Sequence, residues 1–521
     1  MSAKTLRRWL PLLLALGFTS FALATDPSGA NTGGIGNITD PTPNSPLTIE
    51  DLGNILGQTR VALNLVWVMV AMFLVMFMQA GFALVEAGFT RAKNAGHTVM
   101  MNLLVYGLAV LGFLSVGFAL QMGGSGGNVA AFGGGDNLNC LLGLTINDQK
   151  WGFLGCTGFG LAGSSYDVAT FALFFFHLVF LDAALTIPTG ALAERWRSSA
   201  FILYALGASM FIYPVFANWA WGGGWLSQLG KNLGLGNGYV DFAGSGVVHL
   251  TGAVMSLMGI LVLGPRIGRF NRDGTARVIA GHNLPLAILG TFILAFGWFG
   301  FNAGSTLAAT DIRFVTVAVS AMICSASGMV AAALYTSALN GRIDVAMVAN
   351  GMLGGLVANT ASGAFLGAPA SVVVGAVAGL LVVWGTELLE KWRIDDAVGA
   401  IPVHGICGIW GLLCVGIFAD GTYGRGFNGV ESAVTGVLYG NWQQLVAQLI
   451  GILTNILWVA PTSYLLFRAI DRFGGGMRVK PQAEIEGLDY HELTAPAYPR
   501  DDDHEPKPLP QSNTDLMPVE R

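Results

Sequence analysis

Long runs of apolar residues, separated by short polar stretches, fill most of the chain after its first 60 residues. A membrane-crossing helix needs roughly 20 predominantly apolar residues, and eleven runs come close to or exceed that length. They are residues 60–82, 97–121, 168–192, 198–221, 241–264, 282–304, 312–338, 344–362, 369–390, 402–419 and 441–468. The pattern predicts an all-α polytopic membrane protein whose eleven transmembrane helices lie within residues 56–470.

Composition agrees with a chain that is surrounded by membrane lipid. Hydrophobic residues make up 53% of the 521 residues and charged residues only 11%, with a net charge of -5, which is far from the balance of an ordinary soluble domain. The sequence has no long basic run, so no nucleic-acid partner is expected.

The two ends of the chain differ from its apolar middle. Residues 1–24 combine a basic start, an apolar run and an A-L-A tripeptide that ends at Ala24, the pattern of a cleaved secretory signal peptide. The alternative, an uncleaved first span, needs about 20 apolar residues and finds fewer. Residues 25–55 are then expected to be a flexible extracytoplasmic N-terminus, and residues 471–521 a C-terminal tail with a disordered end.

Loop charges predict the orientation of the helices. With the N-terminus outside, the short inner loops contain eleven basic residues: Arg91, Lys93, Arg195, Arg197, Arg266, Arg269, Arg272, Arg277, Arg342, Lys391 and Arg393. The outer segments contain five: Arg60, Lys150, Lys231, Arg313 and Arg425. The charge bias and the signal peptide therefore agree on an N-terminus outside and a tail in the cytoplasm.

Two stretches within the apolar runs repeat one spacing of acidic and imidazole side chains. DFAGSGVVH starts at Asp241 and DAVGAIPVH at Asp396, and in both a His follows eight residues after the Asp. The first begins helix five and the second helix ten, which run in opposite directions, so the chain is predicted to form inverted five-helix repeats plus one extra helix. Eight helical residues rise about 12 Å. We therefore expect each Asp near a membrane face and His249 and His404 together near the middle.

Two neighbouring histidines inside a membrane suggest a path for a small polar molecule. Polar residues at this depth usually face the bundle interior or a solvated path, and repulsion and low dielectric favour two neutral rings. A neutral pair that shares one N–H···N bond keeps one donor and one acceptor, which suits ammonia. The alternative is two structural histidines bonded to carbonyl groups. A transition metal would need a third ligand, so neither a metal nor a cofactor is expected.

The two aspartates have a structural explanation as well as a functional one. Asp241 suits an N-cap that accepts from the N–H groups of the following GSG. A carboxylate at the outer mouth would also attract a cation. Asp396 is expected to act mainly as a cap at the inner face.

Cysteine positions indicate one disulfide. Of five cysteines, Cys140 and Cys156 fall in the long loop 122–167, and the other three lie in apolar runs. Because the loop is predicted to be outside, we expect a disulfide between Cys140 and Cys156.

Five motifs, taken in order, resemble those of the ammonium transporter family, which includes methylammonium permeases and Rh proteins. They are GALAER from Gly190, WGGG from Trp221, DFAGSGVVH from Asp241, GWFGFNAGS from Gly297 and DDAVGAIPVHGICGIWG from Asp395. The resemblance covers most of residues 60–495. It implies an eleven-helix protomer with its own pore, assembly into a homotrimer, and ammonium or methylammonium as the substrate of a protein that is not an enzyme.

The resemblance also implies roles for individual residues. Trp221, Phe180 and Ser305 match the outer site that recruits ammonium, where Asp241 would add its negative potential. An aromatic face attracts a cation by about 0.5–2 kcal/mol, and a hydroxyl group accepts a hydrogen bond from an N–H that K⁺ lacks. On position alone, Trp221 would fit an interfacial aromatic belt.

Further residues match the pore itself. Phe180 and Phe301 correspond to the stacked pair that closes it, and His249 and His404 to its twin histidines. Without the resemblance, Phe180 would be explained by packing and GWFGFNAGS by a close helix crossing. His177 and Asp182, beside Phe180, have no assigned role; they would pair with each other, or Asp182 would face a neighbouring subunit, a water or the helix break near Pro188.

The tail segment EIEGLDYHELTAPAYP, from Glu484, resembles the family's cytoplasmic tail, whose Gly-Leu-Asp segment packs beneath the pore. PII-type regulatory proteins bind the inner face of many bacterial members. This chain lacks the usual His-Gly-Glu after the Asp and continues into the acidic, Pro-rich DDDHEPKPLP, so the resemblance to PII-binding tails is incomplete.

These observations predict a transporter that recruits ammonium, removes its proton and conducts ammonia past the two histidines. Separate transfer of the proton would make transport electrogenic, and the sequence does not decide this. A sensor that signals through its tail is one alternative, although residues 469–521 are too few for a typical enzymatic output domain. A cation or proton channel is the other.

Overall fold

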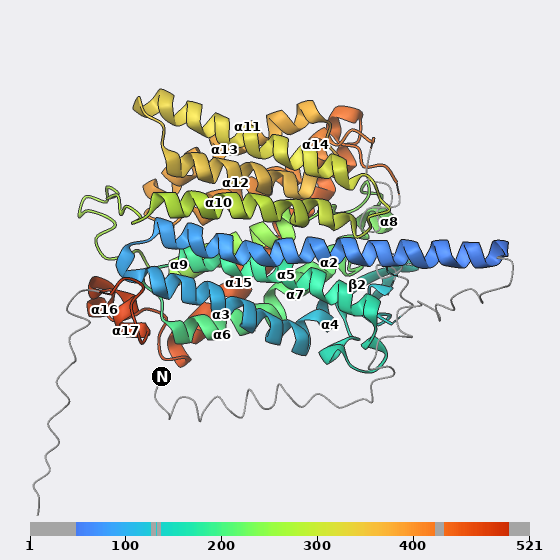
Figure 1. Cartoon of the computed structure of the whole chain (residues 1–521), viewed down its shortest axis with the longest axis horizontal. Coiled ribbons are helices and arrows are strands. Elements are labelled where there is room, and N and C mark those ends of the chain that lie inside the picture. The colour runs from blue at the N-terminus through green and yellow to red at the C-terminus, as the bar shows by residue number, and fades with distance from the viewer. Residues whose placement is uncertain (1–47, 127–131, 133–136, 423–431, 500–521) are drawn as a thin grey trace, which may run out of the picture.

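The computed structural model describes residues 48–126, 132, 137–422 and 432–499. Within them, long helices lie roughly side by side in a bundle (Figure 1). The predicted signal peptide, most of the predicted flexible N-terminus and the acidic end of the tail lie outside the described residues.

Eleven helical segments correspond to the eleven predicted spans. They are α2 (Ile49–Phe89); α3 (Ala95–Gly112), continued by the π-helical turn Phe113–Gly117 and α4 (Phe118–Met122); α5 (Val168–Ala191); α6 (Ser198–Gly207), continued by the π-helical turn Ala208–Ile212 and α7 (Tyr213–Trp221); the π-helical turn Ser245–Leu250 with α9 (Thr251–Leu263); α10 (Leu284–Trp298) with the π-helical turn Phe299–Ala303; α11 (Phe314–Asn340); α12 (Val345–Ser362); α13 (Ala368–Lys391); the π-helical turn Ile401–Ile406 with α14 (Cys407–Phe418); and α15 (Trp442–Phe473). Ten of these segments are long and apolar enough to cross a membrane. The eleventh, α12, has 18 residues.

Several predicted boundaries were wrong. The first span ends at Phe89 instead of residue 82 and the last at Phe473 instead of residue 468, and two starts also differ. Helix α2 begins at Ile49, because Thr48 and Asp51 form a capping box there, so residues 49–55 are helical rather than flexible. The fifth span begins at Ser245 instead of residue 241, because Gly244 takes a left-handed conformation with a φ of 112°, which ends helical continuity. Asp241 therefore precedes the helix.

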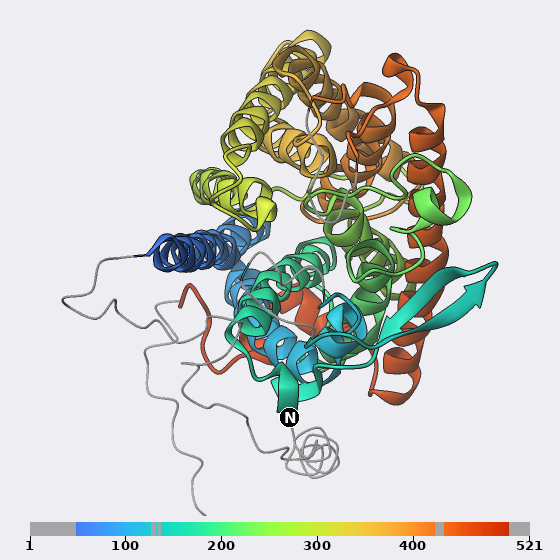
Figure 2. The ribbon, with the colours of Figure 1, turned by 90° about the vertical axis from the view of Figure 1, so that its right-hand side faces the viewer.

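The two halves of the fold meet where α2 lies along α10. In Figure 1, α11 to α14 gather on one side of this pair and α3 to α7 on the other. The α2 and α10 backbones approach so closely that a Cβ atom on Gly290 would lie 2.6 Å from the carbonyl oxygen of Gly81. The final helix, α15, packs on α9 and α14 (Figure 2).

One end of the bundle, which we call the hairpin face, carries a β-hairpin. Strands β1 (Leu141–Ile146) and β2 (Gln149–Gly155) pair antiparallel and project from the helices (Figure 2). Regular strands thus occupy part of the segment 122–167, which was expected only as a long loop. Cys140 and Cys156 form a disulfide at the hairpin's base, with Cα atoms 5.1 Å apart.

The opposite end, which we call the tail face, carries the short helices α16 (Pro481–Glu486) and α17 (Leu488–Glu492) (Figure 1). Asp489 accepts hydrogen bonds from the backbone N–H groups of Gly96 and His97 at 2.9 and 2.8 Å. Lys93 donates to the carbonyl oxygen of Glu484 at 2.8 Å. The described part of the tail is therefore docked against the start of α3.

A buried charged cluster ties the loops of the tail face together. Arg266 contacts Glu194 at 2.9 Å and Asp395 at 2.8 Å, and Glu194 also accepts from Arg91 at 2.8 Å. Burial alone would raise the pKa of Glu194, but the guanidinium groups of Arg266 and Arg91 outweigh it and lower the pKa to about 2. The cluster joins loops from both halves of the chain.

Candidate functional site

Two histidine rings meet in the interior of the bundle. The Nδ1 atoms of His249 and His404 lie 3.1 Å apart, the ring centroids are 5.1 Å apart and the planes differ by 25°. Both side chains are buried. The inverted spacing predicted that these residues meet, and each stands on a π-helical turn of a different half. When both rings are neutral, one Nδ1 donates and the other accepts.

The outer ring nitrogen of His249 is not used by any described protein group. Its Nε2 atom is buried and has no hydrogen-bond partner, although buried polar atoms are usually paired. Phe301 and Trp298 stack on this ring, with centroids 5.5 and 5.3 Å away. An unpaired nitrogen with aromatic walls can accept from, or donate to, a small molecule that enters beside it.

A column of aromatic rings leads from the histidines toward the hairpin face. Phe301 stacks on Phe180 with centroids 4.1 Å apart and an angle of 27°, and Phe180 stacks on Phe176 at 4.5 Å. Neither Phe180 nor Phe301 is exposed, at 0% each. The two residues predicted to close the pore are therefore in contact, directly next to His249.

Trp221, at the end of α7, stands beside this column. Its ring meets Phe180 edge to face at 6.1 Å, and its Nε1 donates to the carbonyl oxygen of Asp241 at 2.7 Å. Ser305 lies on the turn after Phe301 and donates to the Phe301 carbonyl oxygen at 2.8 Å. The structure thus brings Trp221 and Phe180 into direct contact, and it connects Ser305 to them through Phe301.

Asp241 and Asp396 occupy equivalent positions in the two halves. Asp241 is buried and accepts from the N–H groups of Gly244, Gly246 and Val247 at 3.0, 2.9 and 2.8 Å. Asp396 accepts from the N–H groups of Gly399 and Ile401 at 3.1 and 2.6 Å. Each aspartate therefore fixes the start of the turn that carries a histidine, as the capping explanation predicted.

His177 and Asp182 each bond to a residue of another helix instead of to each other. His177 Nδ1 lies 2.9 Å from the amide nitrogen of Gln121 on α4. Asp182 is hydrogen-bonded to Gln79 of α2, and Gln79 also donates to Thr186 at 2.9 Å. The proposed mutual pairing was wrong because these side chains point to different helices.

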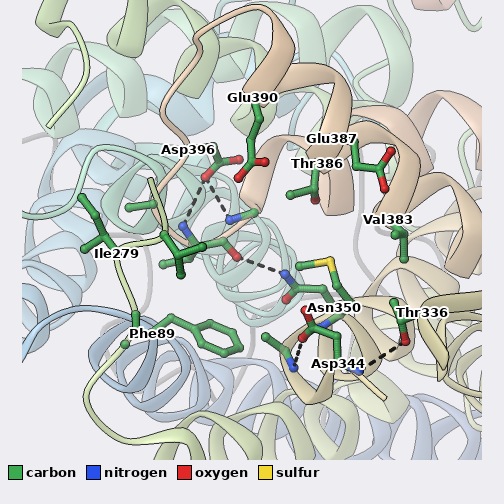
Figure 3. A pocket seen from close by; sticks show the side chains of 18 of the residues that line it. Phe89, Ile279, Thr336, Asp344, Asn350, Val383, Thr386, Glu387, Glu390 and Asp396 are labelled. Carbon is green, nitrogen blue, oxygen red and sulfur yellow. Dashed lines mark hydrogen bonds between the residues drawn. The ribbon is translucent and has the colours of Figure 1, made fainter. Parts of the chain in front are cut away.

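Two cavities lie between the histidines and the tail face. The smaller, of about 30 Å³, is lined by His404, Phe82, Glu86 and Asn350 among others. The larger, of about 430 Å³, is lined by Asp396, Asp344 and Glu390 together with residues from both halves (Figure 3). Both cavities share the lining residues Asn350, Val398 and Gly399, so they follow one another from His404 toward the tail face.

Sequence reasoning missed two residues of this region. Trp298 stacks on His249 and donates to the Thr360 hydroxyl at 3.0 Å. It belongs to the motif GWFGFNAGS, in which only Phe301 and Ser305 were assigned roles. Glu86 follows the apolar run 60–82 and still belongs to the long helix α2; an acidic residue there was a usable signal, because an intramembrane carboxylate usually has a function. In the part of the chain that the structure describes, no group of three or more His, Cys, Asp and Glu side chains is placed to hold a metal ion.

Comparisons with known proteins agree with this architecture. The family model described as the Ammonium Transporter Family matches residues 66–498. Ammonium transporter Amt2 of Archaeoglobus fulgidus is 45% identical over 460 residues, covering 88% of this chain and 91% of that protein. Ammonium transporter Amt1 of Haloferax mediterranei is 36% identical over 470 residues, covering 87% and 82%.

Solved structures have the same fold. A Sensor Amt Protein is 32% identical, with a TM-score of 0.72, and the match covers 84% of this chain and 99% of that one. Mep2 of Candida albicans, at 24% identity and a TM-score of 0.67 over 80% and 86%, shares the fold. The chain is therefore a multi-pass membrane protein with inverted repeats. It belongs to the ammonium transporter family.

Proposed function

We propose that this protein takes up ammonium by recruiting it at the hairpin face, removing its proton and conducting ammonia past His249 and His404 to the tail face. Relatives named as ammonium transporters support the substrate. The observation that carries the proposal is the 3.1 Å contact of two buried imidazoles that lie between an aromatic column and a series of cavities.

Recruitment is assigned to Trp221, Phe180 and Ser305. The face of the Trp221 ring attracts a cation by about 0.5–2 kcal/mol, and Phe180, whose ring stacks on Phe176 and Phe301, meets Trp221 edge to face and holds it in place. The Ser305 hydroxyl keeps acceptor capacity while it donates to Phe301, so it adds one hydrogen bond for an N–H cation. Asp241 contributes mainly by shaping this site, because its carboxylate is already occupied by three backbone N–H groups.

Passage depends on loss of charge. Phe180 and Phe301 leave no exposed surface at their contact, and a bare charge in the middle of a membrane costs several kcal/mol. A neutral ammonia molecule that enters after a ring displacement finds the unpaired His249 Nε2 beside the aromatic pair. The histidine pair then offers the donor and the acceptor that ammonia needs.

We place the hairpin face outside the cell and the tail face in the cytoplasm of a bacterial inner membrane, because basic residues are more numerous in the loops of the tail face. A homotrimer, a removed signal peptide at residues 1–24 and a PII-type partner at the tail face remain parts of the proposal. The family resemblance supports the trimer and the partner.

Ammonium-evoked current on a solid-supported membrane tests the proposal. Proteoliposomes with wild type, His249→Ala and Asp241→Ala are compared, with Glu50→Gln at the exposed start of α2 as a matched control. We expect a current for wild type and the control, block by methylammonium but not by K⁺, and loss of current or selectivity in both pore variants. Unchanged current and selectivity in both would refute the assigned roles.

A sensor is the second candidate, because a protein named Sensor Amt Protein is among the similar structures. The described tail contains only α16 and α17, which are short and docked on the bundle. Tracer uptake separates the two candidates: a transporter accumulates labelled methylammonium in proteoliposomes, whereas a pure sensor binds it without uptake.

A further inference from the structure

Glu86 is a buried carboxyl group on the tail side of the histidine pair. It stands on α2, its side chain is buried at 3% exposure, and it lines the same cavity of about 30 Å³ as His404. Phe82, one turn earlier on the same helix face, contacts the His404 ring at 6.3 Å. The carboxyl group and the imidazole therefore face one small space.

Three donor groups surround Glu86. Asn102 donates to its Oε2 at 2.7 Å, and the backbone N–H of Gly190 donates to the same carboxylate. The Thr189 hydroxyl lies 2.7 and 2.8 Å from the two carboxylate oxygens. No Lys or Arg pairs with Glu86 in the described residues, so its charge is balanced by dipoles alone.

The Thr189 hydroxyl can serve two protonation states of Glu86. It also lies 2.5 Å from the carbonyl oxygen of Thr186, but a hydroxyl has a single hydrogen to donate. When Thr189 donates to Glu86, the carboxylate is satisfied in its ionised form. When Thr189 donates to Thr186, its oxygen is free to accept from a protonated Glu86. Rotation of one hydroxyl thus satisfies the group before and after it gains a proton.

We propose that Glu86 is the proton acceptor on the tail side of the histidine pair, an inference that rests on the proposed function. Ammonium gives up its proton on the hairpin side, and the histidine pair passes a proton on through His404. A cavity of about 30 Å³ holds one water molecule, which relays the proton from His404 to the Glu86 carboxylate. The O–H bond forms on Glu86 as the N–H bond on His404 breaks, and His404 becomes neutral again.

Release follows the route of the cavities. Asn350 and Val398 line both the small cavity and the larger one, and Asp396 and Glu390 are among the residues that line the larger cavity (Figure 3). Loss of the proton to water there restores the Glu86 carboxylate and keeps atoms and charge balanced. Besides Glu86, the titratable side chains that border this route are His404, Asp396, Asp344, Glu387, Glu390, Arg266 and Arg269.

The test compares wild type, Glu86→Gln and Glu86→Asp in proteoliposomes, with Glu50→Gln as the control on the same helix. Ammonium-evoked current is measured on a solid-supported membrane, and ammonia permeation by the internal pH change after a pH jump at zero membrane potential. We expect Glu86→Gln to lower the current by about 100-fold, the lower range for a positioned proton acceptor, and to leave ammonia permeation near the wild-type value. Glu86→Asp should recover part of the current because it keeps a carboxyl group.

Infrared difference spectra on addition of ammonium chloride detect protonation of a carboxyl group directly. A purely structural role of Glu86 would not produce such a signal. A carboxyl C=O band should appear in wild type and be absent in Glu86→Gln. Equal current in wild type and Glu86→Gln, or a parallel fall of current and ammonia permeation that Glu86→Asp does not relieve, would overturn the inference. A wild type without any ammonium-evoked current would instead show that the proposed function itself has failed.

Discussion

The Nδ1 atoms of His249 and His404 lie 3.1 Å apart although 155 positions separate the residues in the chain. Each ring is carried by a π-helical turn that follows a capping aspartate. The contact therefore depends on both halves of the fold and on the way they pack. Each ring also supplies the hydrogen-bond partner of the other ring's Nδ1 atom.

Replacing both histidines should cost less than the sum of the two single replacements. His249→Ala or His404→Ala leaves a buried Nδ1 atom without its partner, which costs about 1–3 kcal/mol. The double variant removes both atoms, so its destabilisation should be smaller than the sum of the single effects. Thermal unfolding of the detergent-solubilised protein, followed by tryptophan fluorescence, measures this coupling, and strict additivity would contradict it.

The aromatic pair should control access to the histidines. Phe301→Ala removes the ring that stacks on both Phe180 and His249, so we expect leakage of K⁺ or protons and weaker discrimination of ammonium. Phe299→Ala, two residues away and 36% exposed, is the matched control and should keep wild-type selectivity. Equal ion flux through both variants in a vesicle assay would argue against a gate at Phe301.

The charged cluster of the tail face should lose stability in acid. Because the pKa of Glu194 falls from 4.5 to about 2 on folding, its contribution is complete above pH 4.5 and is lost as the pH falls toward 2. The contribution at neutral pH is on the order of 3 kcal/mol. Glu194→Gln should therefore melt at a much lower temperature than wild type at pH 7, and the difference in melting temperature should become smaller near pH 3. A difference in melting temperature that does not change with pH would contradict an origin in the ionised Glu194.

The hairpin disulfide should stabilise the hairpin face. A bridge that closes a loop of about 15 residues contributes roughly 3 kcal/mol in the chain-entropy model, and Cys140 and Cys156 are 16 positions apart. A Cys140→Ala/Cys156→Ala variant should melt earlier and no longer respond to a reducing agent. The free cysteines Cys324, Cys407 and Cys414 are buried, so reduction of wild type reports on the disulfide. A wild type that melts equally with and without reductant would contradict this prediction.

The sequence was sufficient to predict the helices and the meeting of His249 with His404. Both predictions depend on features that can be read from the sequence alone: the apolar runs and the repeated Asp-to-His spacing in two oppositely oriented helices. The sequence could not locate the start of the fifth span, since that depends on the left-handed Gly244. Glu86 was overlooked for a related reason: its partners Asn102 and Thr189 come from two other helices. Such a cluster can be recognised only once the tertiary packing is known.

The partner of His177 shows the same limit. Asp182 follows His177 by five positions, and this spacing allowed either a mutual bond or separate partners. The choice of Gln121 and Gln79 is made by helices α4 and α2. The π-helical turns at His249 and His404 were likewise not predicted, because local residue preferences do not distinguish them from ordinary helix.

Docking of the tail has a consequence for biosynthesis. The first N–H groups of α3 receive their carboxylate from Asp489, which is 393 positions further along the chain than Gly96. A ribosome thus delivers this partner only after the last membrane helix has been made. A copy that is cut short by an early stop codon therefore lacks the carboxylate that accepts from the first N–H groups of α3.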